Sequence, residues 1–369
     1  MRIICFILIF FSLTGCKKDK NSSPEISNKM ILVYIAANNN LQNEAINSIK
    51  KMQAGLTKTN GGTLLVFAKT SSQNSYLLKI KHSTANRIVS DTLKTYKNEN
   101  SSDPVFFQRV IADSRALYPA NSYGLILWSH ATSWAPPANK RISTESFGSD
   151  DENEMDIRDL NKALPDDLEY LMFDACSMAS MEVCFELKEK AKYILASPAE
   201  VLSTSFPYDQ ITNHLFEGRD GLNMVAQKFI SFYRSMEGLH SSATISLIDT
   251  KLMDSIAHES NLLLSQKIPK IPFNKAKIQH LDFENGSGVP AYDFLSYLKN
   301  NYEPTEYDRL KKQIEKAVIF KGNTEGFLGI PIREFCGLSI YLPEANDPYK
   351  SYYSNLGWGT KAGWNKLFP

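Results

Sequence analysis

The sequence predicts an α/β fold built on a mostly parallel central sheet. Short apolar runs recur along the chain, and stretches with helical spacing or turn residues separate them, which is the alternation typical of this class. Several of the runs are apolar throughout, as expected of strands covered on both faces. We therefore expect helices on both sides of the sheet.

The apolar runs predict strands, in chain order, at 30–36, 63–68, 76–80, 124–128, 170–173, 193–196, 244–248 and 338–342. Between them, apolar residues spaced three and four apart predict crossover helices at 41–52, 106–118, 181–191 and 222–235. Segment 133–154 lacks periodicity, mixes prolines with charges and is interpreted as a long exposed loop. Segment 251–335 is expected to be mainly helical, and the aromatic-rich tail at 349–364 to pack back onto the body.

Composition excludes several classes of protein. The 369 residues include 41 basic and 40 acidic side chains, and the net charge of +1 gives no electrostatic footprint for nucleic acid. With 43% hydrophobic residues the chain can bury a large core, which argues against disorder. Five cysteines are too few for a disulfide scaffold.

The N-terminus has the layout of an export signal. Residues 1–15 hold a basic start and an apolar run too short to span a membrane, followed by Leu13-Thr-Gly-Cys16, which looks like a bacterial lipobox. Lipidation of Cys16 would tether the folded part through a flexible stretch at 16–28. Lys17 favours the outer membrane of a Gram-negative bacterium, and the alternative is an ordinary signal peptide with a chance cysteine. The folded core would then occupy 29–250 and an integrated C-terminal extension 251–369.

Two apolar runs end in residues that can carry out nucleophilic chemistry. His130 follows the run at 124–128, and Cys176 follows the run at 170–173. In an open parallel sheet such ends meet at one crevice, where Cys176 can act as nucleophile and His130 can protonate the leaving amine. The main-chain N–H groups of Ala131 and Cys176 can hold an oxyanion. Taken singly, a cysteine here is more often a small buried hydrophobe and a histidine structural.

The thiols also bear on this interpretation. After removal of a signal and lipidation of Cys16, the remaining cysteines are Cys176, Cys184 and Cys336, so at least one should be free. A redox pairing of Cys176 with Cys184 is disfavoured because eight residues of helix rise about 12 Å, beyond disulfide reach.

These motifs resemble the clostripain family of cysteine peptidases, relatives of caspases, gingipains and legumains. The matching stretches include Trp128-Ser-His130, Phe173-Asp-Ala-Cys-Ser-Met-Ala179 and Gly337-Leu-Ser-Ile-Tyr-Leu-Pro343. The resemblance implies a caspase-like α/β/α sandwich and cleavage after a basic residue, usually Arg, with Asp174 as the anion of the substrate pocket and Glu200 in the cleft. A carboxylate suits that pocket because it can pair with a desolvated guanidinium. The alternative for Asp174 is a helix-capping acid.

The resemblance also bears on maturation and cofactors. Family members are often zymogens, so Lys140 and Arg141 become a possible processing site, although a solvated charge pair is an equal interpretation. We expect no cofactor and no metal site. Calcium enters by family analogy alone, since the acids near residue 150 lack EF-hand spacing and are interpreted as a solvated loop.

Together these observations predict a lipid-anchored, exported cysteine endopeptidase acting on polypeptides through a Cys176/His130 dyad, and a monomer. The rival hypothesis is a catalytically inactive, peptide-binding surface lipoprotein on the same fold.

Overall fold

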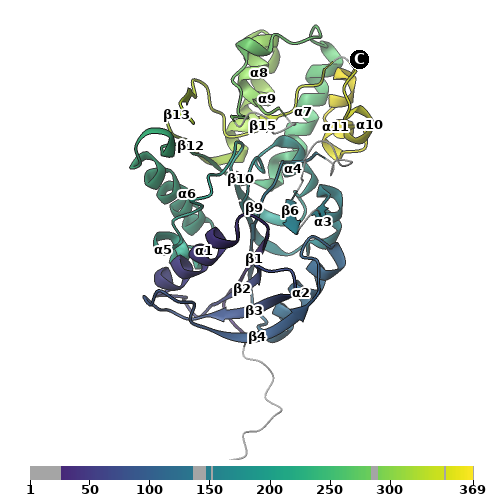
Figure 1. The fold of residues 1–369 in the computed structure, drawn as a ribbon. Helices are drawn as coiled ribbons and strands as arrows, with labels where there is room; N and C mark the ends of the chain where they lie inside the picture. Colours follow the sequence, from purple (N-terminus) through teal and green to yellow (C-terminus); the bar gives the residue numbers. More distant parts are fainter. Residues whose placement is uncertain (1–25, 136–146, 151–152, 284–289, 345, 369) are drawn as a thin grey trace, which may run out of the picture.

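The fold is that of a computed structural model, which describes residues 26–135, 147–150, 153–283, 290–344 and 346–368. One large sheet runs through the molecule in the strand order β12-β10-β9-β8-β5-β1-β2-β3-β4 (Figure 1). Its strands are β1 (Met30–Asn38), β2 (Thr63–Lys69), β3 (Asn74–Ile80), β4 (Ser90–Lys97), β5 (Tyr123–Trp128), β8 (Leu168–Asp174), β9 (Ala191–Ala196), β10 (Thr244–Asp249) and β12 (Val318–Asn323).

The centre of this sheet is parallel and its edges are antiparallel. Strands β9, β8, β5, β1 and β2 pair in parallel, whereas β3, β4, β10 and β12 pair antiparallel to their neighbours. A short β6 (Phe147–Asp150) continues beside the end of β1 and pairs with β7 (Asn153–Met155). Because these central strands are parallel, the carboxyl ends of β1, β5 and β8 lie at the same end of the sheet.

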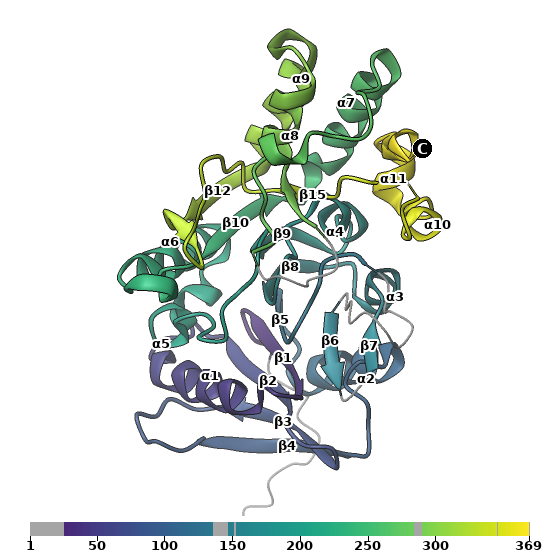
Figure 2. The same ribbon diagram turned by 45° about the horizontal axis from the view of Figure 1, so that its top comes forward.

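Two apolar cores cover the two faces of the sheet. On β1, Ile31, Val33 and Ile35 pack into one core, while the alternate residues pack into the other. The first core is closed by α1 (Gln42–Gly55), α5 (Tyr208–Ile211) and α6 (Gly218–Arg234), and the second by α2 (Pro104–Leu117), α3 (Ile157–Ala163) and α4 (Met181–Glu186), as Figure 2 shows. The predicted α/β fold with a mostly parallel sheet and helices on both faces is confirmed.

The C-terminal part adds helices to the second core and one strand to the sheet. β12 pairs with β10 at the sheet edge. The helices of this part are α7 (Met253–Gln266), α8 (Phe294–Asn301), α9 (Pro304–Ala317), α10 (Lys350–Tyr353) and α11 (Gly357–Lys361). Two small ladders join β11 (Tyr292–Asp293) to β15 (Ser339–Ile340) and β13 (Gly326–Phe327) to β14 (Ile330–Pro331). Single 3-10 turns lie at Thr212–Phe216, Gly238–His240, Thr250–Leu252, Lys275–Lys277 and Trp364–Leu367.

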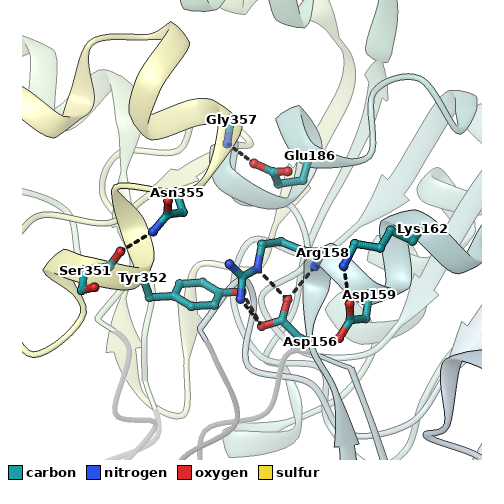
Figure 3. A network of polar contacts seen from close by, with 9 residues as sticks. All are labelled: Asp156, Arg158, Asp159, Lys162, Glu186, Ser351, Tyr352, Asn355 and Gly357. Atoms are coloured by element: carbon teal, nitrogen blue, oxygen red, sulfur yellow. Dashed lines mark hydrogen bonds and ion pairs between the residues drawn. The ribbon is translucent and has the colours of Figure 1, made fainter.

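The aromatic tail packs back onto the body, as the sequence predicts. Trp134, which follows His130 closely in the chain, is enclosed by the rings of Tyr341, Tyr349, Tyr352 and Tyr353 at centroid distances of 4.9–6.1 Å. Figure 3 shows the polar contacts that attach α10 and α11 to α3 and α4. The Tyr352 hydroxyl donates to Asp156 at 2.8 Å, and the Gly357 N–H donates to Glu186. The C-terminal helices therefore brace α3, α4 and the loop after β5.

The interpretation of 133–154 as an exposed loop is wrong for part of the segment. β6 is buried along its whole length. Asp150 is only 3% exposed, and its carboxylate accepts hydrogen bonds from the Asn38 side chain (2.6 Å) and from the Ser101 N–H (2.6 Å). The acid is therefore a structural acceptor and not a solvated charge.

The helix predicted at 181–191 is also too long. α4 ends at Glu186, and β9 begins at Ala191, directly after Lys190, whose carbonyl accepts from the Leu168 N–H at 3.1 Å. The end of segment 181–191 is therefore extended, because β9 pairs with β8 in the sheet. Among the helices of the described ranges, none combines the length and apolar character needed to cross a bilayer.

Candidate active site

The carboxyl ends of β5 and β8 lie next to each other in the sheet. The two strands pair in parallel with Trp128 opposite Asp174, and the Ser129 N–H donates to the Asp174 carbonyl at 3.4 Å just beyond the strands. Two residues after this pair come His130 and Cys176. Because β5 and β8 are neighbouring parallel strands, the segments that carry these two residues emerge at the same end of the sheet. The structure thus unites the strand ends that the sequence singles out.

Cys176 lies on a tight turn that directly follows β8. The next residue, Ser177, has a left-handed backbone (φ 59°), a conformation that is uncommon for a side chain other than glycine. Its N–H donates to the Ala199 carbonyl at 2.8 Å, which holds the turn against the segment after β9. The Val201 N–H lies 3.3 Å from the Cys176 sulfur. One hydrogen bond therefore holds the backbone of the turn, and a second contact is made by the half-buried sulfur itself.

The other two described thiols are in a different environment. Cys184 and Cys336 are buried, and burial raises the pKa of each thiol well above its usual range. All three cysteines of the described ranges are free, so the prediction of at least one free thiol is confirmed. The redox pairing of Cys176 with Cys184 does not form. Accessibility distinguishes Cys176 as the thiol able to react, because thiolates need solvation or a positive partner.

His130 is held by its backbone and by its ring. Its carbonyl accepts from the Gly148 N–H at 3.0 Å, which ties the loop after β5 to β6. The preceding Ser129 hydroxyl donates to the Ala36 carbonyl at 2.6 Å, at the end of β1. The ring Nε2 lies 2.6 Å from Oδ1 of Asn40, which follows β1 on the other side of β5. Asn40 was not among the residues that sequence reasoning selected.

Asp174 is buried beside the nucleophile turn. Its side chain faces the core that contains Trp128 and Tyr208, and it is only 5% exposed. The hydroxyls of Ser205 and Tyr208 (2.9 Å) both donate to its Oδ2. Burial raises the pKa of Asp174 to about 6, and these hydrogen bonds oppose the rise.

The helix-capping alternative for Asp174 is wrong. α4 has Ser180 as its N-cap, whose hydroxyl accepts from the Val183 N–H at 3.3 Å. The same hydroxyl accepts from Ser133 at 2.7 Å, so the cap also ties α4 to the histidine loop. The carboxyl of Asp174 is therefore left to the Ser205 and Tyr208 side of the sheet.

Glu200 lies one residue before the Val201 that contacts the thiol. Its side chain is 4% exposed, and its Oε1 accepts from the Phe283 N–H at 2.7 Å. Ala131 is 4% exposed and packs in the core on the α2–α4 side. Cys16, Lys140 and Arg141 lie outside the described residues. Within the described ranges, no cluster of three His, Cys, Asp or Glu side chains is arranged to hold a metal ion.

A half-buried thiol and an imidazole that follow adjacent parallel strands, in a sheet with helices on both faces, are the arrangement expected of a caspase-like cysteine peptidase. Residues 33–368 match the model of the Clostripain family, and the chain belongs to that family. Clostripain from Hathewaya histolytica is 23% identical, with 95% of this chain and 81% of the relative aligned.

Two solved structures support the same assignment. A secreted C11 cysteine protease from Bacteroides thetaiotaomicron, in complex with an irreversible peptide inhibitor, matches with a TM-score of 0.78 and 26% identity over 92% of this chain and 99% of its own. An inactive zymogen C11 protease from Parabacteroides distasonis matches with a TM-score of 0.79 and 27% identity over 94% and 99%. The chain is thus a clostripain-family cysteine endopeptidase with a caspase-like fold.

Proposed function

We propose that the protein cleaves polypeptides after Arg or Lys, with Cys176 as nucleophile and His130 as the proton donor and acceptor. The observation that carries the proposal is the half-buried Cys176 thiol just after β8, whose parallel neighbour β5 is the strand that His130 follows. The sulfur attacks the scissile carbonyl, and His130 delivers a proton to the leaving amine. Water then hydrolyses the thioester and restores the thiol. The N–H groups of Ala131 and Cys176 are the proposed oxyanion donors.

Asp174 is the proposed anion that selects a basic side chain. Above its pKa of about 6 the carboxyl is charged in a site where burial leaves it poorly hydrated. An incoming guanidinium or ammonium replaces the missing hydration with charge-assisted hydrogen bonds, which are stronger than those of the two hydroxyls alone. Glu200, whose neighbour Val201 contacts the thiol, is the second acid proposed for the cleft.

Localisation and maturation form a separate part of the proposal. The lipobox-like Leu13-Thr-Gly-Cys16 supports lipidation of Cys16 and attachment to the outer membrane. Lys140 and Arg141 would suit self-processing by an enzyme that cuts after basic residues. We propose that the mature enzyme is a monomer that needs no cofactor for the chemical steps. Peptidase activity after exhaustive EDTA treatment tests the independence from cofactors. A loss of activity that added calcium restores would contradict it.

The nucleophile is tested with fluorogenic peptides that end in Arg, Lys or Leu. We expect the wild type to cleave the Arg and Lys peptides, and Cys176→Ala to lose at least about a thousandfold of kcat/KM. Cys336→Ala is the matched control because it removes a buried thiol far along the chain. Full activity in Cys176→Ala would refute the nucleophile, and equal cleavage of the Leu peptide would refute the basic preference.

Self-processing is tested on purified proteins without added protease. Wild type should give two fragments divided after Lys140 or Arg141, whereas Cys176→Ala should stay whole. An intact and fully active wild type would remove the processing step. Tight peptide binding without any cleavage would instead support the inactive, peptide-binding alternative.

A further inference from the structure

We propose that Asn40 is a positioning residue for His130, whose side-chain oxygen orients the imidazole toward the Cys176 thiol. The inference rests on the proposed dyad and adds a third strand end to it. Asn40 Oδ1 lies 2.6 Å from the Nε2 of His130, within the range of a good hydrogen bond.

The strand order places the three groups in a row. β5 lies between β1 and β8, and both neighbours run parallel to it. Asn40 follows β1, His130 follows β5 and Cys176 follows β8, so the segment that carries His130 lies between the segments that carry Asn40 and Cys176. Neighbouring strands are about 4.8 Å apart, which suits one hydrogen bond on each side of a ring.

The turn that carries Asn40 is already fixed by its two neighbours. Asn38 donates to Asp150 at 2.6 Å, and Asn39 donates to the Ser149 carbonyl at 2.9 Å. The Asn39 side chain also accepts from the Leu41 N–H at 2.9 Å, at the start of α1. These contacts shape the turn without Asn40, whose exposed side chain is left for the imidazole.

The contact selects one tautomer of the ring. A carboxamide oxygen is an acceptor, so Nε2 carries the hydrogen, and Nδ1 becomes the basic nitrogen of the neutral imidazole. Nδ1 is then the nitrogen that exchanges a proton with the thiol and the leaving amine. The nearby acids are committed to other donors: Asp150 to Asn38 and Ser101 on the β1 side, and Asp174 to Ser205 and Tyr208 on the β8 side.

The test compares Asn40→Ala, Asn40→Asp and Asn39→Ala with wild type, using kcat, KM and the pH profile of kcat/KM on an Arg peptide. Asn40→Ala should lower kcat about tenfold and leave KM within about twofold, because it removes orientation of a reacting group and no substrate contact. Asn40→Asp keeps only acceptor atoms and should restore most of kcat. Its charge favours the imidazolium, so the limb of the profile that reports this ion should move to higher pH by up to about one unit. Asn39→Ala, which removes side-chain contacts of the same turn and keeps the Asn40 side chain, should lower kcat less than Asn40→Ala does and keep the wild-type profile.

Three outcomes decide the proposal. Wild-type kcat and profile in Asn40→Ala, in an enzyme that Cys176→Ala inactivates, would overturn the role of Asn40 and leave the dyad intact. The same kcat loss in Asn39→Ala as in Asn40→Ala would also overturn it, because the turn and not the contact would matter. Activity that survives in Cys176→Ala would be a failure of the proposed dyad itself. The melting temperature of each variant shows whether its substitution leaves the fold intact.

Discussion

Glu182 should make the stability of this protein depend on pH in a way that one substitution removes. The residue lies in the first turn of α4 and is fully buried. Its Oε1 accepts from the Tyr341 N–H at 3.1 Å and from the Tyr353 hydroxyl at 2.7 Å, which joins α4 to the C-terminal segment. Burial raises the pKa of Glu182 from 4.5 to about 7, and the Tyr353 hydrogen bond opposes the rise.

The size and sign of the effect follow from this pKa. A difference of 7 − 4.5 = 2.5 corresponds to about 3 kcal/mol, at about 1.4 kcal/mol for each pKa unit. The folded protein holds the proton more tightly than the unfolded chain, so the contribution of Glu182 is complete below pH 4.5. It declines as pH rises from about 4.5 to 7 and is lost above 7.

Glu182→Gln keeps the acceptor oxygen and has no proton to lose. We therefore expect the free energy of unfolding of Glu182→Gln, relative to the parent, to increase by about 3 kcal/mol between pH 4.5 and pH 8. Urea denaturation at both pH values measures it, in a Cys176→Ala background that prevents self-cleavage. Glu189→Gln, an exposed acid three residues beyond the α4 helix, should change stability by less than about 0.5 kcal/mol at either pH.

The comparison cancels every other titrating group, because parent and variant share them. A stability difference between Glu182→Gln and its parent that stays constant from pH 4.5 to pH 8 would refute the assignment of a raised pKa to Glu182. A larger loss of stability in Glu182→Gln at pH 8 than at pH 4.5 would reverse the expected pH dependence. It would show that the native state favours the carboxylate form of Glu182.

Two further substitutions test the packing of Trp134 on one face of the sheet and the hydrogen bonds to Asp174 on the other. Trp134→Ala should lower the free energy of unfolding by about 3–5 kcal/mol, because the indole is 1% exposed and packed among tyrosines, and a urea midpoint close to wild type would contradict this. Tyr208→Phe removes one of the hydroxyls that donate to Asp174, so the pKa of that carboxyl should rise further above about 6. The KM of Tyr208→Phe for an Arg peptide should therefore exceed that of wild type most at pH 6 and least at pH 8, whereas a KM ratio independent of pH would contradict the reasoning.

The parallel centre of the sheet could be predicted because its strands are buried on both faces. Each is a continuous apolar run, and such runs need no knowledge of partners to be recognised. β4 was not predicted because its sequence, SDTLKTYK, belongs to an edge strand with most side chains exposed. β6 escaped for a different reason. Its four residues are buried against β1, Ser101 and the second apolar core, and the local sequence cannot reveal these partners.

The candidate site was predictable to the same extent. His130 and Cys176 both follow apolar strands, so the topology alone brings them to one edge. The partners of Asp174 could not be predicted, because Ser205 and Tyr208 lie 31 and 34 residues further along the chain. For Asn40 the only local signal was three consecutive asparagines after a strand. Such a run is typical of a turn and does not say which side chain reaches the neighbouring strand end.

The two faces of the sheet support different parts of the proposed reaction. Ala131 and Trp134, in the loop that carries His130, pack into the core on the α2–α4 side, together with the C-terminal aromatics. Asp174 instead faces Tyr208, in the core closed by α1, α5 and α6. Packing defects at Trp134 should therefore reach the histidine loop and lower stability and kcat together. Changes around Asp174 should alter KM for basic peptides and spare the reactivity of the thiol, because the sheet itself separates the two supports.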